Sequence, residues 1–184
     1  MADTGTSSTS TTTSTTEAVK QVMRYEIADY INVNGLSGAT EDFQLMGTGF
    51  TKMDEDSGTK TDSKTYINEK SASIKVTGYE NKFKFESDLI TNAKAGAYIY
   101  KIGHDKLTGA DAQTTYVRVD IYDPVSGKNN EFNARKFKVS VVADSVEGNG
   151  GEGVTFSGEL DGIGDPIIGT FNTSTGVFTA ASAS

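Results

Sequence analysis

The sequence predicts a mainly β fold, a β-sandwich or small barrel of two packed antiparallel sheets with one short flanking helix. Apolar and polar residues alternate with a period of two along most of the chain, and such alternation is typical of strands with one buried face. Only one segment has three-to-four spacing instead. Glycine, asparagine and serine separate the alternating segments, as turns require. The chain of 184 residues is long enough for one ordinary domain.

The firmest element is a hairpin over residues 114–144. Both halves alternate, and Pro124 with the Ser-Gly-Lys-Asn-Asn run at 126–130 supplies the turn between them. We expect one buried face and one outer face. On the outer face, opposite charges are expected to pair across the two strands, with Arg118 and Asp120 beside Lys136 and Lys138.

Shorter strands are expected before and after this hairpin. The segments 74–76 and 83–85 form either a second hairpin or one bent strand around Gly78, and a last short hairpin turns at 173–176. The other alternating segments are 23–27, 43–50, 154–156 and 167–171.

A short helix is predicted over about 92–102. The apolar residues Ala95, Tyr98, Ile99 and Ile102 fall on one helical face. Thr91 or Asn92 can cap its start and Gly103 suits its end. Gly96 costs about 1 kcal/mol relative to alanine, so this helix must depend on packing.

A polar segment at about 52–64 predicts a long loop, which in a compact domain is usually functional or disordered. Asp54, Asp56 and Asp62 suggest calcium, but a calcium-binding loop needs glycine at its sixth position and glutamate at its twelfth. Thr59 and Thr65 occupy those positions. A solvated or partner-contacting loop is the favoured interpretation.

The ends of the chain differ in composition from the middle. Residues 1–16 are almost wholly serine, threonine and glycine, which predicts a flexible N-terminal arm before a single β domain at 17–184. No lysine or arginine follows Lys138, and the net charge is −8. Conventional nucleic-acid binding, which needs a basic patch, is therefore not expected.

No catalytic, metal or cofactor site is expected. The chain has no cysteine. Its only histidine, His104, follows the predicted helix just before Asp105 and Lys106, where we expect a loop and a solvated imidazole. The glycine-rich segment 147–153 lacks the Gly-Lys-Ser/Thr of a phosphate-binding loop. The sequence has no apolar run of about 18 residues. We therefore expect that the chain is made in the cytoplasm and does not insert into a membrane.

Several segments together resemble one known family. The segment 108–142, which includes TTYVRVDIYDPV and NEFNARKFKVSVV, and the ending SGELDGIGDPIIGTFNTSTGVFTA resemble major tail proteins of long-tailed phages of Gram-positive bacteria. Residues 66–67, 76–79 and 82–88 fit the same pattern, so the resemblance covers about 22–181. The serine- and threonine-rich leader departs from it.

The resemblance implies a structural virion protein rather than an enzyme. Its subunits would close into hexameric rings that stack into the tail tube, the conduit for genome ejection, in a non-contractile tail. Contractile tails and type VI secretion tubes share the wider fold. The implied partners are further copies of the chain, the tape-measure, terminator and distal tail proteins, and double-stranded DNA that passes without specific binding.

Two sets of residues become candidates for these contacts. The predicted loop would reach the next ring, and an acidic wall would let DNA slide past without sticking. The inter-ring candidates are Lys52, Asp54, Glu55, Asp56, Asp62 and Lys64, and the lumen-lining candidates are Glu152, Glu159, Asp161 and Asp165. The main alternative is a secreted or surface adhesin or S-layer-like β-sandwich; an enzyme of unknown class is a second.

Overall fold

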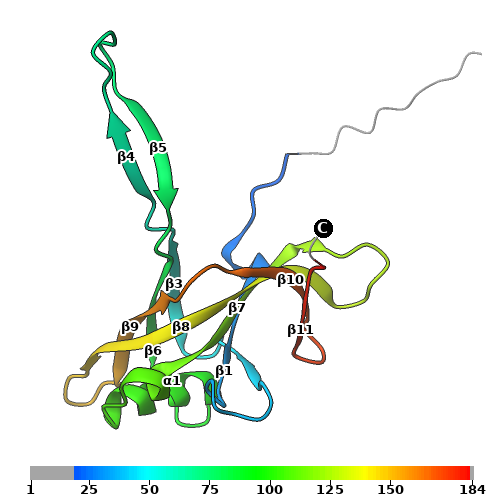
Figure 1. Ribbon diagram of the computed structural model, residues 1–184. Coiled ribbons are helices and arrows are strands. Elements are labelled where there is room, and N and C mark those ends of the chain that lie inside the picture. Colours follow the sequence, from blue (N-terminus) through cyan, green and yellow to red (C-terminus); the bar gives the residue numbers. More distant parts are fainter. Residues whose placement is uncertain (1–18, 183–184) are drawn as a thin grey trace, which may run out of the picture.

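The computed structural model describes residues 19–182, and these form a strongly curled antiparallel sheet with one helix against it (Figure 1). The predicted N-terminal arm at 1–16 lies outside the described residues. The strands are β1 (Ile27–Asn32), β2 (Phe43–Leu45), β3 (Phe50–Asp56), β4 (Lys60–Lys64), β5 (Ser73–Gly78), β6 (Lys82–Asp88), β7 (Gln113–Pro124), β8 (Glu131–Glu147), β9 (Thr155–Gly162), β10 (Ile167–Asn172) and β11 (Val177–Ala180). The helices are α1 (Lys94–His104) and two 3-10 turns, η1 (Arg24–Glu26) and η2 (Gly109–Ala112).

The 17-residue strand β8 is the central strand of the sheet and pairs with β7, β9 and β10. The order of the strands is β2-β1-β7-β8-β9-β6-β3, and β10 with β11 branches from β8. β9 and β10 pair one after the other along the same edge of β8, separated by the break at 163–166. One long strand therefore supports two different parts of the sheet.

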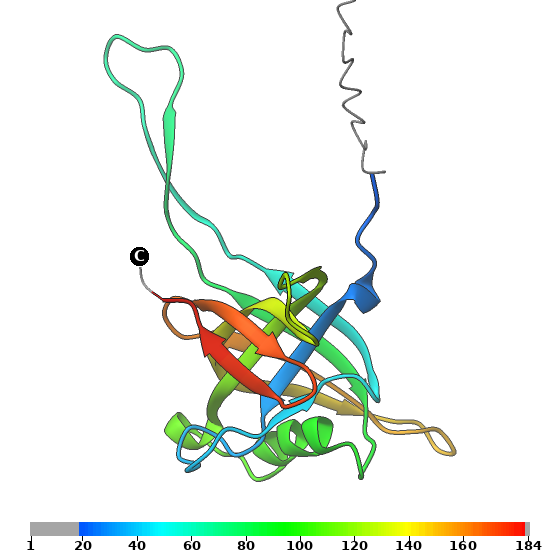
Figure 2. The same ribbon diagram turned by 90° about the vertical axis from the view of Figure 1, so that its right-hand side faces the viewer.

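The two ends of this strand order are consecutive in the chain. β2 and β3 are joined by the short turn 46–49, in which the Phe50 amide donates to the Gly47 carbonyl oxygen at 3.1 Å. The sheet therefore curls into an incomplete barrel (Figure 2), and a groove of about 520 Å³ lies between β1 and β3. The mainly antiparallel β fold with one helix is confirmed, but the second, two-stranded sheet β4–β5 protrudes instead of packing on the first.

The inside of the curl holds the larger hydrophobic cluster, which α1 closes with Ala95, Ile99 and Ile102. Aromatic rings fill its centre: Phe83 lies 4.6 Å from Tyr116 and 4.8 Å from Phe137 between ring centroids. Each such ring contributes on the order of 1.5–3 kcal/mol through burial. A smaller cluster on the other face joins β7 to β10 and β2 through Val117, Val119, Ala134, Phe171 and Phe43.

The central hairpin is confirmed as β7 and β8, but its expected charge pairing is wrong. Arg118 lies opposite Arg135, and Val117 lies opposite Lys136. Arg118 therefore faces the inside of the curl and is buried, while Lys136 faces the smaller cluster. Both faces of β7 are covered, so alternation alone could not say which face of β7 matches the apolar face of β8.

The helix is confirmed with shifted ends. It begins after Ala93, with no side-chain cap from Thr91 or Asn92, and it continues through Gly103. Gly103 lies in the helix because α1 approaches β8 closely there. A Cβ built on Gly103 would be 2.5 Å from the Cβ of Ala143.

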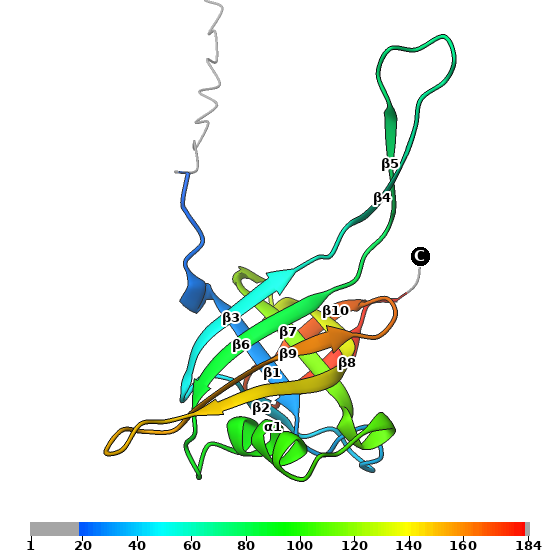
Figure 3. The same ribbon diagram turned by 90° about the vertical axis from the view of Figure 1, so that its left-hand side faces the viewer.

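The predicted loop at 52–64 is wrong, because residues 52–56 belong to β3 and 60–64 to β4, with only 57–59 outside the strands (Figure 3). The β4–β5 pair is a two-stranded ribbon that continues β3 and β6 beyond the body, and every residue of β4 is exposed. A strand with no buried face carries no apolar alternation, so its sequence resembles a loop. A hairpin formed by 74–76 and 83–85 was one of two expectations, and it is wrong. β5 pairs with β4, and β6 pairs with β3 and β9.

Candidate functional site

The β4–β5 hairpin (residues 60–78) exposes an apolar face. Val76 lies opposite Thr61 and Ile74 lies opposite Ser63, so both aliphatic side chains share one face of the ribbon. Ile74 is 73% exposed, and at the tip Ile67 is fully exposed. The other face carries Asp62 opposite Lys75.

This hairpin receives little support from its own subunit. Within residues 19–182 it is joined to the body at its base, where the Glu80 amide donates to the Ser57 carbonyl oxygen at 3.2 Å and the Glu80 carboxylate pairs with Lys60. Gly58 has φ +50°, and a Cβ there would meet the Glu80 carbonyl oxygen at 2.3 Å. An isolated two-stranded hairpin is at best marginally stable in water, so its exposed apolar residues form a candidate contact surface.

The outer face of β3, β6, β9 and β8 is a second candidate surface, and it is polar. Lys82 lies between two carboxylates of β9, with its Nζ 2.8 Å from Glu159 and 3.0 Å from Asp161. Hydrogen bonds to Glu159 and then Asp161 raise the pKa of Lys82 well above its ordinary value. Lys52 pairs in the same way with Glu86 at 3.1 Å. Cross-strand ion pairs thus cover this face and partly neutralise its acidic residues.

This four-stranded face has an unpaired edge at each side. β3 ends the strand order. On the far side, β7 pairs with β8 only as far as Ser140, so residues 141–147 of β8 have no strand beside them on that edge within residues 19–182. Unpaired edges are templates for pairing with another chain.

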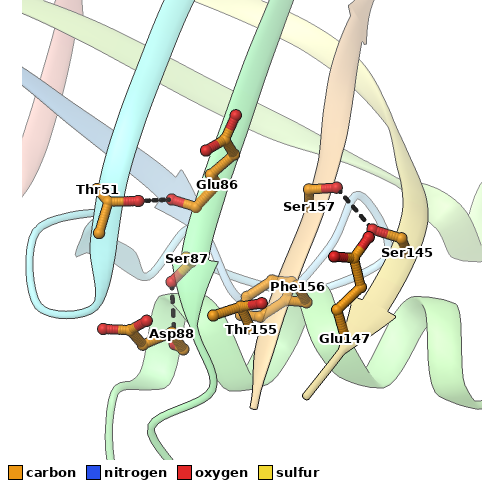
Figure 4. Close-up of a pocket in the computed structure, with 9 residues that line it drawn as sticks. All are labelled: Thr51, Glu86, Ser87, Asp88, Ser145, Glu147, Thr155, Phe156 and Ser157. Atoms are coloured by element: carbon orange, nitrogen blue, oxygen red, sulfur yellow. Dashed lines mark hydrogen bonds between the residues drawn. The ribbon is translucent and has the colours of Figure 1, made fainter. Parts of the chain in front are cut away.

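A polar groove of about 310 Å³ lies at the end of this face nearest α1 (Figure 4). Its carboxylates are Glu86, Asp88 and Glu147, and hydroxyl groups of five serines and threonines also line it. The Ser145 and Ser157 hydroxyls are 3.0 Å apart across β8 and β9. No lysine or arginine is among its lining residues.

The structure separates the six predicted inter-ring residues into three environments. Lys52, Asp54 and Asp56 lie on the polar outer side of β3. Asp62 and Lys64 lie in the hairpin. Glu55 points into the barrel, where its carboxylate accepts two hydrogen bonds from Arg135, at 2.7 and 2.9 Å.

The four predicted lumen-lining acidic residues are likewise divided. Glu159 and Asp161 lie together on the outer face of β9. Glu152 lies in the turn between β8 and β9, where its carboxylate accepts a hydrogen bond from the Asn149 side chain at 2.9 Å. Asp165 lies in the break between β9 and β10. Only Glu159 and Asp161 share a surface.

A buried ionic network, which the sequence did not indicate, holds β3 against β1, β7 and β8. Arg118 lies 3.4 Å from Glu55 and 3.9 Å from Asp29, and the Tyr116 hydroxyl donates to Asp29. Burial, reinforced by the Asp29 carboxylate, raises the pKa of Tyr116 well above its ordinary value. The only available sequence signal was a charged residue inside an otherwise apolar strand.

The described residues show no arrangement typical of a catalytic or metal site. Within 19–182, no group of three or more histidine, aspartate or glutamate side chains is placed to hold a metal. His104 is exposed at the end of α1, and its Nδ1 lies 2.8 Å from the Asp105 carboxylate. Over the same residues, no helix is long and apolar enough to cross a bilayer.

Comparisons with known proteins identify the fold. No protein-family model matches the sequence, and no curated protein matches it. The tail tube of phage SPP1 is similar in structure, with a TM-score of 0.60 and 14% identity over 78% of this chain and 77% of that one. The tail of an empty gene transfer agent particle, which has C6 symmetry, matches with a TM-score of 0.53 and 9% identity over 80% of this chain and 98% of that one. The virion of a native gene transfer agent particle matches with a TM-score of 0.54 and 7% identity over 80% of this chain and 98% of that one. The chain therefore has the fold of tail-tube subunits.

Proposed function

We propose that this protein is a virion structural protein that assembles into stacked rings and forms the tube of a phage tail, through which the genome leaves the particle. The observation that carries the proposal is the shared fold with the SPP1 tail tube and the gene transfer agent tail. The resemblance of residues 22–181 to major tail proteins supports the same function independently. Identity to these solved structures is low, so the likeness to them lies in the fold.

The unpaired strand edges support the proposed ring closure. On one side of the polar face β3 has an edge with no strand beside it within residues 19–182, and so do residues 141–147 of β8 on the other side. Head-to-tail pairing of these edges would join neighbouring subunits into a continuous cylindrical sheet and leave no edge exposed. The six-fold symmetry of the gene transfer agent tail supports six subunits in each ring.

The polar face of this sheet would then line the bore. Glu159 and Asp161 remain the lumen-lining candidates on that face, whereas Glu152 and Asp165 remain candidates only at its margins. Glu159 and Asp161 form ion pairs with Lys82, so the wall of the bore would be hydrophilic and of mixed charge. Such a wall has no basic patch to hold phosphates, so DNA would pass without specific binding.

The hairpin would supply the contact between rings. Among the predicted inter-ring residues, Asp62 and Lys64 project from the body, while Glu55 is engaged inside it. The partners would be other copies of the chain along the tube, and tape-measure, terminator and distal tail proteins in its bore and at its ends. We propose a non-contractile tail; a sheath protein around the tube would contradict that part.

Electron microscopy of the purified full-length protein at rising concentration tests the proposal. Stacked rings or hollow tubes with a central bore are the expected result. Isolated globules at every concentration, together with their absence from the tails of native particles, would contradict it and favour a surface-binding β-sandwich.

A further inference from the structure

We propose that the β4–β5 hairpin of one subunit docks in the acidic groove at Glu86, Asp88 and Glu147 of a second copy, the subunit above it in the next ring. This inference rests on the proposed function and names both sides of the contact between rings. It is carried by three observations: the charge of the hairpin, the charge of the groove, and their positions at opposite ends of the same two strands.

The hairpin is basic in an acidic protein. Residues 60–78 contain four lysines and two carboxylates, while the whole chain has 17 lysines and arginines against 25 aspartates and glutamates. Lys60 pairs with Glu80 at the base. Lys64 and Lys70, toward the tip, are exposed and form no ion pair within residues 19–182. Glu69 is the one carboxylate of residues 64–72, against Lys64 and Lys70, so the outer half of the hairpin has a net positive charge.

The groove has the complementary charge. Asp88 and Glu147 are exposed and form no ion pair within the described chain, and Glu86 shares its charge only with Lys52. The groove is also hollow and lined by hydroxyl groups that can accept hydrogen bonds from an ammonium group (Figure 4). Its only aromatic lining residue, Phe156, offers an apolar floor.

The hairpin and the groove lie at opposite ends of one ribbon. β3 runs from Thr51 at the groove to Asp56 at the hairpin, and β6 returns from Lys82 to Asp88. Figures 1 and 3 show the hairpin leaving one end of the body, while α1 and the β8–β9 turn lie at the other. A copy displaced along the strands thus places its groove above the hairpin of the first. At about 3.3 Å per residue, the eight residues from Lys60 to the tip reach about 26 Å.

Charge reversal on each side tests this contact. We expect K64E/K70E and D88K/E147K each to raise the concentration needed for tube growth by roughly tenfold, while single rings still form. Combining both reversals in one chain restores the opposite charges and should restore tube length. Circular dichroism and thermal unfolding of each variant confirm that the body is folded. K128E, in the turn between β7 and β8, is the control and should grow like the wild type.

Cysteine cross-linking gives an independent measurement, because the chain has no cysteine of its own. Oxidised tubes of K70C/E147C should yield a ladder of covalent multimers, and each single variant only dimers or monomers. K70C/N129C, with the second thiol in the β7–β8 turn, should yield no ladder.

The outcomes separate this inference from the proposed function. Tubes of normal length from both reversals, equal loss in K128E, or a ladder only from K70C/N129C would overturn the docking contact and leave the tube itself standing. A wild-type protein that never forms rings or tubes would instead contradict the proposed function.

Discussion

β7 and the β4–β5 hairpin are both strands of one chain, yet they have opposite environments. β7 is covered on both faces: Tyr116 is fully buried in one hydrophobic cluster and Val117 in the other. The hairpin is covered on neither, and Ile74 and Tyr66 are largely exposed. The difference indicates a division of labour. The body is stabilised by internal burial, whereas under the proposed function the hairpin would be covered by neighbouring copies.

Proline in each region is the strongest way to break this comparison. Val139 is fully buried and pairs with Thr114 on one side and Gly162 on the other. V139P removes a backbone donor and disturbs the core, which costs about 3 kcal/mol or more, so we expect the body not to fold. V76P in the exposed strand β5 is the matched control and should leave body stability unchanged. Circular dichroism and limited proteolysis measure both; a folded V139P would show that β8 is not central.

Replacing the hairpin tests its dependence on partners. A variant in which an Asn-Gly turn replaces residues 60–78 should keep the melting temperature of the body and lose ring stacking, because β4 and β5 pair only with each other. Shorter deletions that enter β3 are unsuitable, since Met53 is buried and Glu55 holds the internal ion pairs. Calorimetry and electron microscopy give the two results. Long tubes from this variant would remove the hairpin from the inter-ring contact.

The close approach of α1 to β8 gives a smaller, local effect. G103A places a methyl group 2.5 Å from the Cβ of Ala143, and such overpacking typically costs about 1–3 kcal/mol. Thermal or urea unfolding measures the loss. A143G removes the opposing methyl group, so the double variant should recover part of the stability that G103A loses. Equal stability of G103A and the wild type would mean that the helix shifts without cost.

The smallest effect concerns Asp120 at the outer end of β7. Burial raises the pKa of its carboxyl above the ordinary value of 3.8. The folded state then holds the proton more tightly than the unfolded state. The contribution of Asp120 to the free energy of unfolding therefore falls as the pH rises from 3.8 through the raised pKa of the folded state. D120N should therefore melt slightly higher than the wild type at pH 7, and the difference should vanish below pH 3.8. The Tyr122 side chain also hydrogen-bonds the Asp120 carboxylate and opposes the effect of burial on this pKa. A lower melting temperature for D120N at pH 7 would show that this hydrogen bond outweighs burial.

The sequence predicted the regular parts of the body well. The alternation of β7 and β8 and the helical spacing of Ala95, Ile99 and Ile102 each reflect one buried face, and the structure confirms those elements. Features that depend on distant partners were missed. Arg118 was expected on the surface because alternation does not reveal that Glu55, far away in sequence, lies opposite it. The first strand of the hairpin, β4, was predicted as part of a loop because all of its residues are exposed and carry no apolar alternation, whereas the alternation at 74–76 was recognised.

The continuity of the hairpin with β3 and β6 has a mechanical consequence. Tension on the hairpin runs along β6, whose seven residue pairs with β9 lie side by side across the direction of pull. Interstrand hydrogen bonds perpendicular to the strands share such a shearing load and must rupture together. A tube joined through this element would therefore resist stretching and bending without any covalent link between its rings.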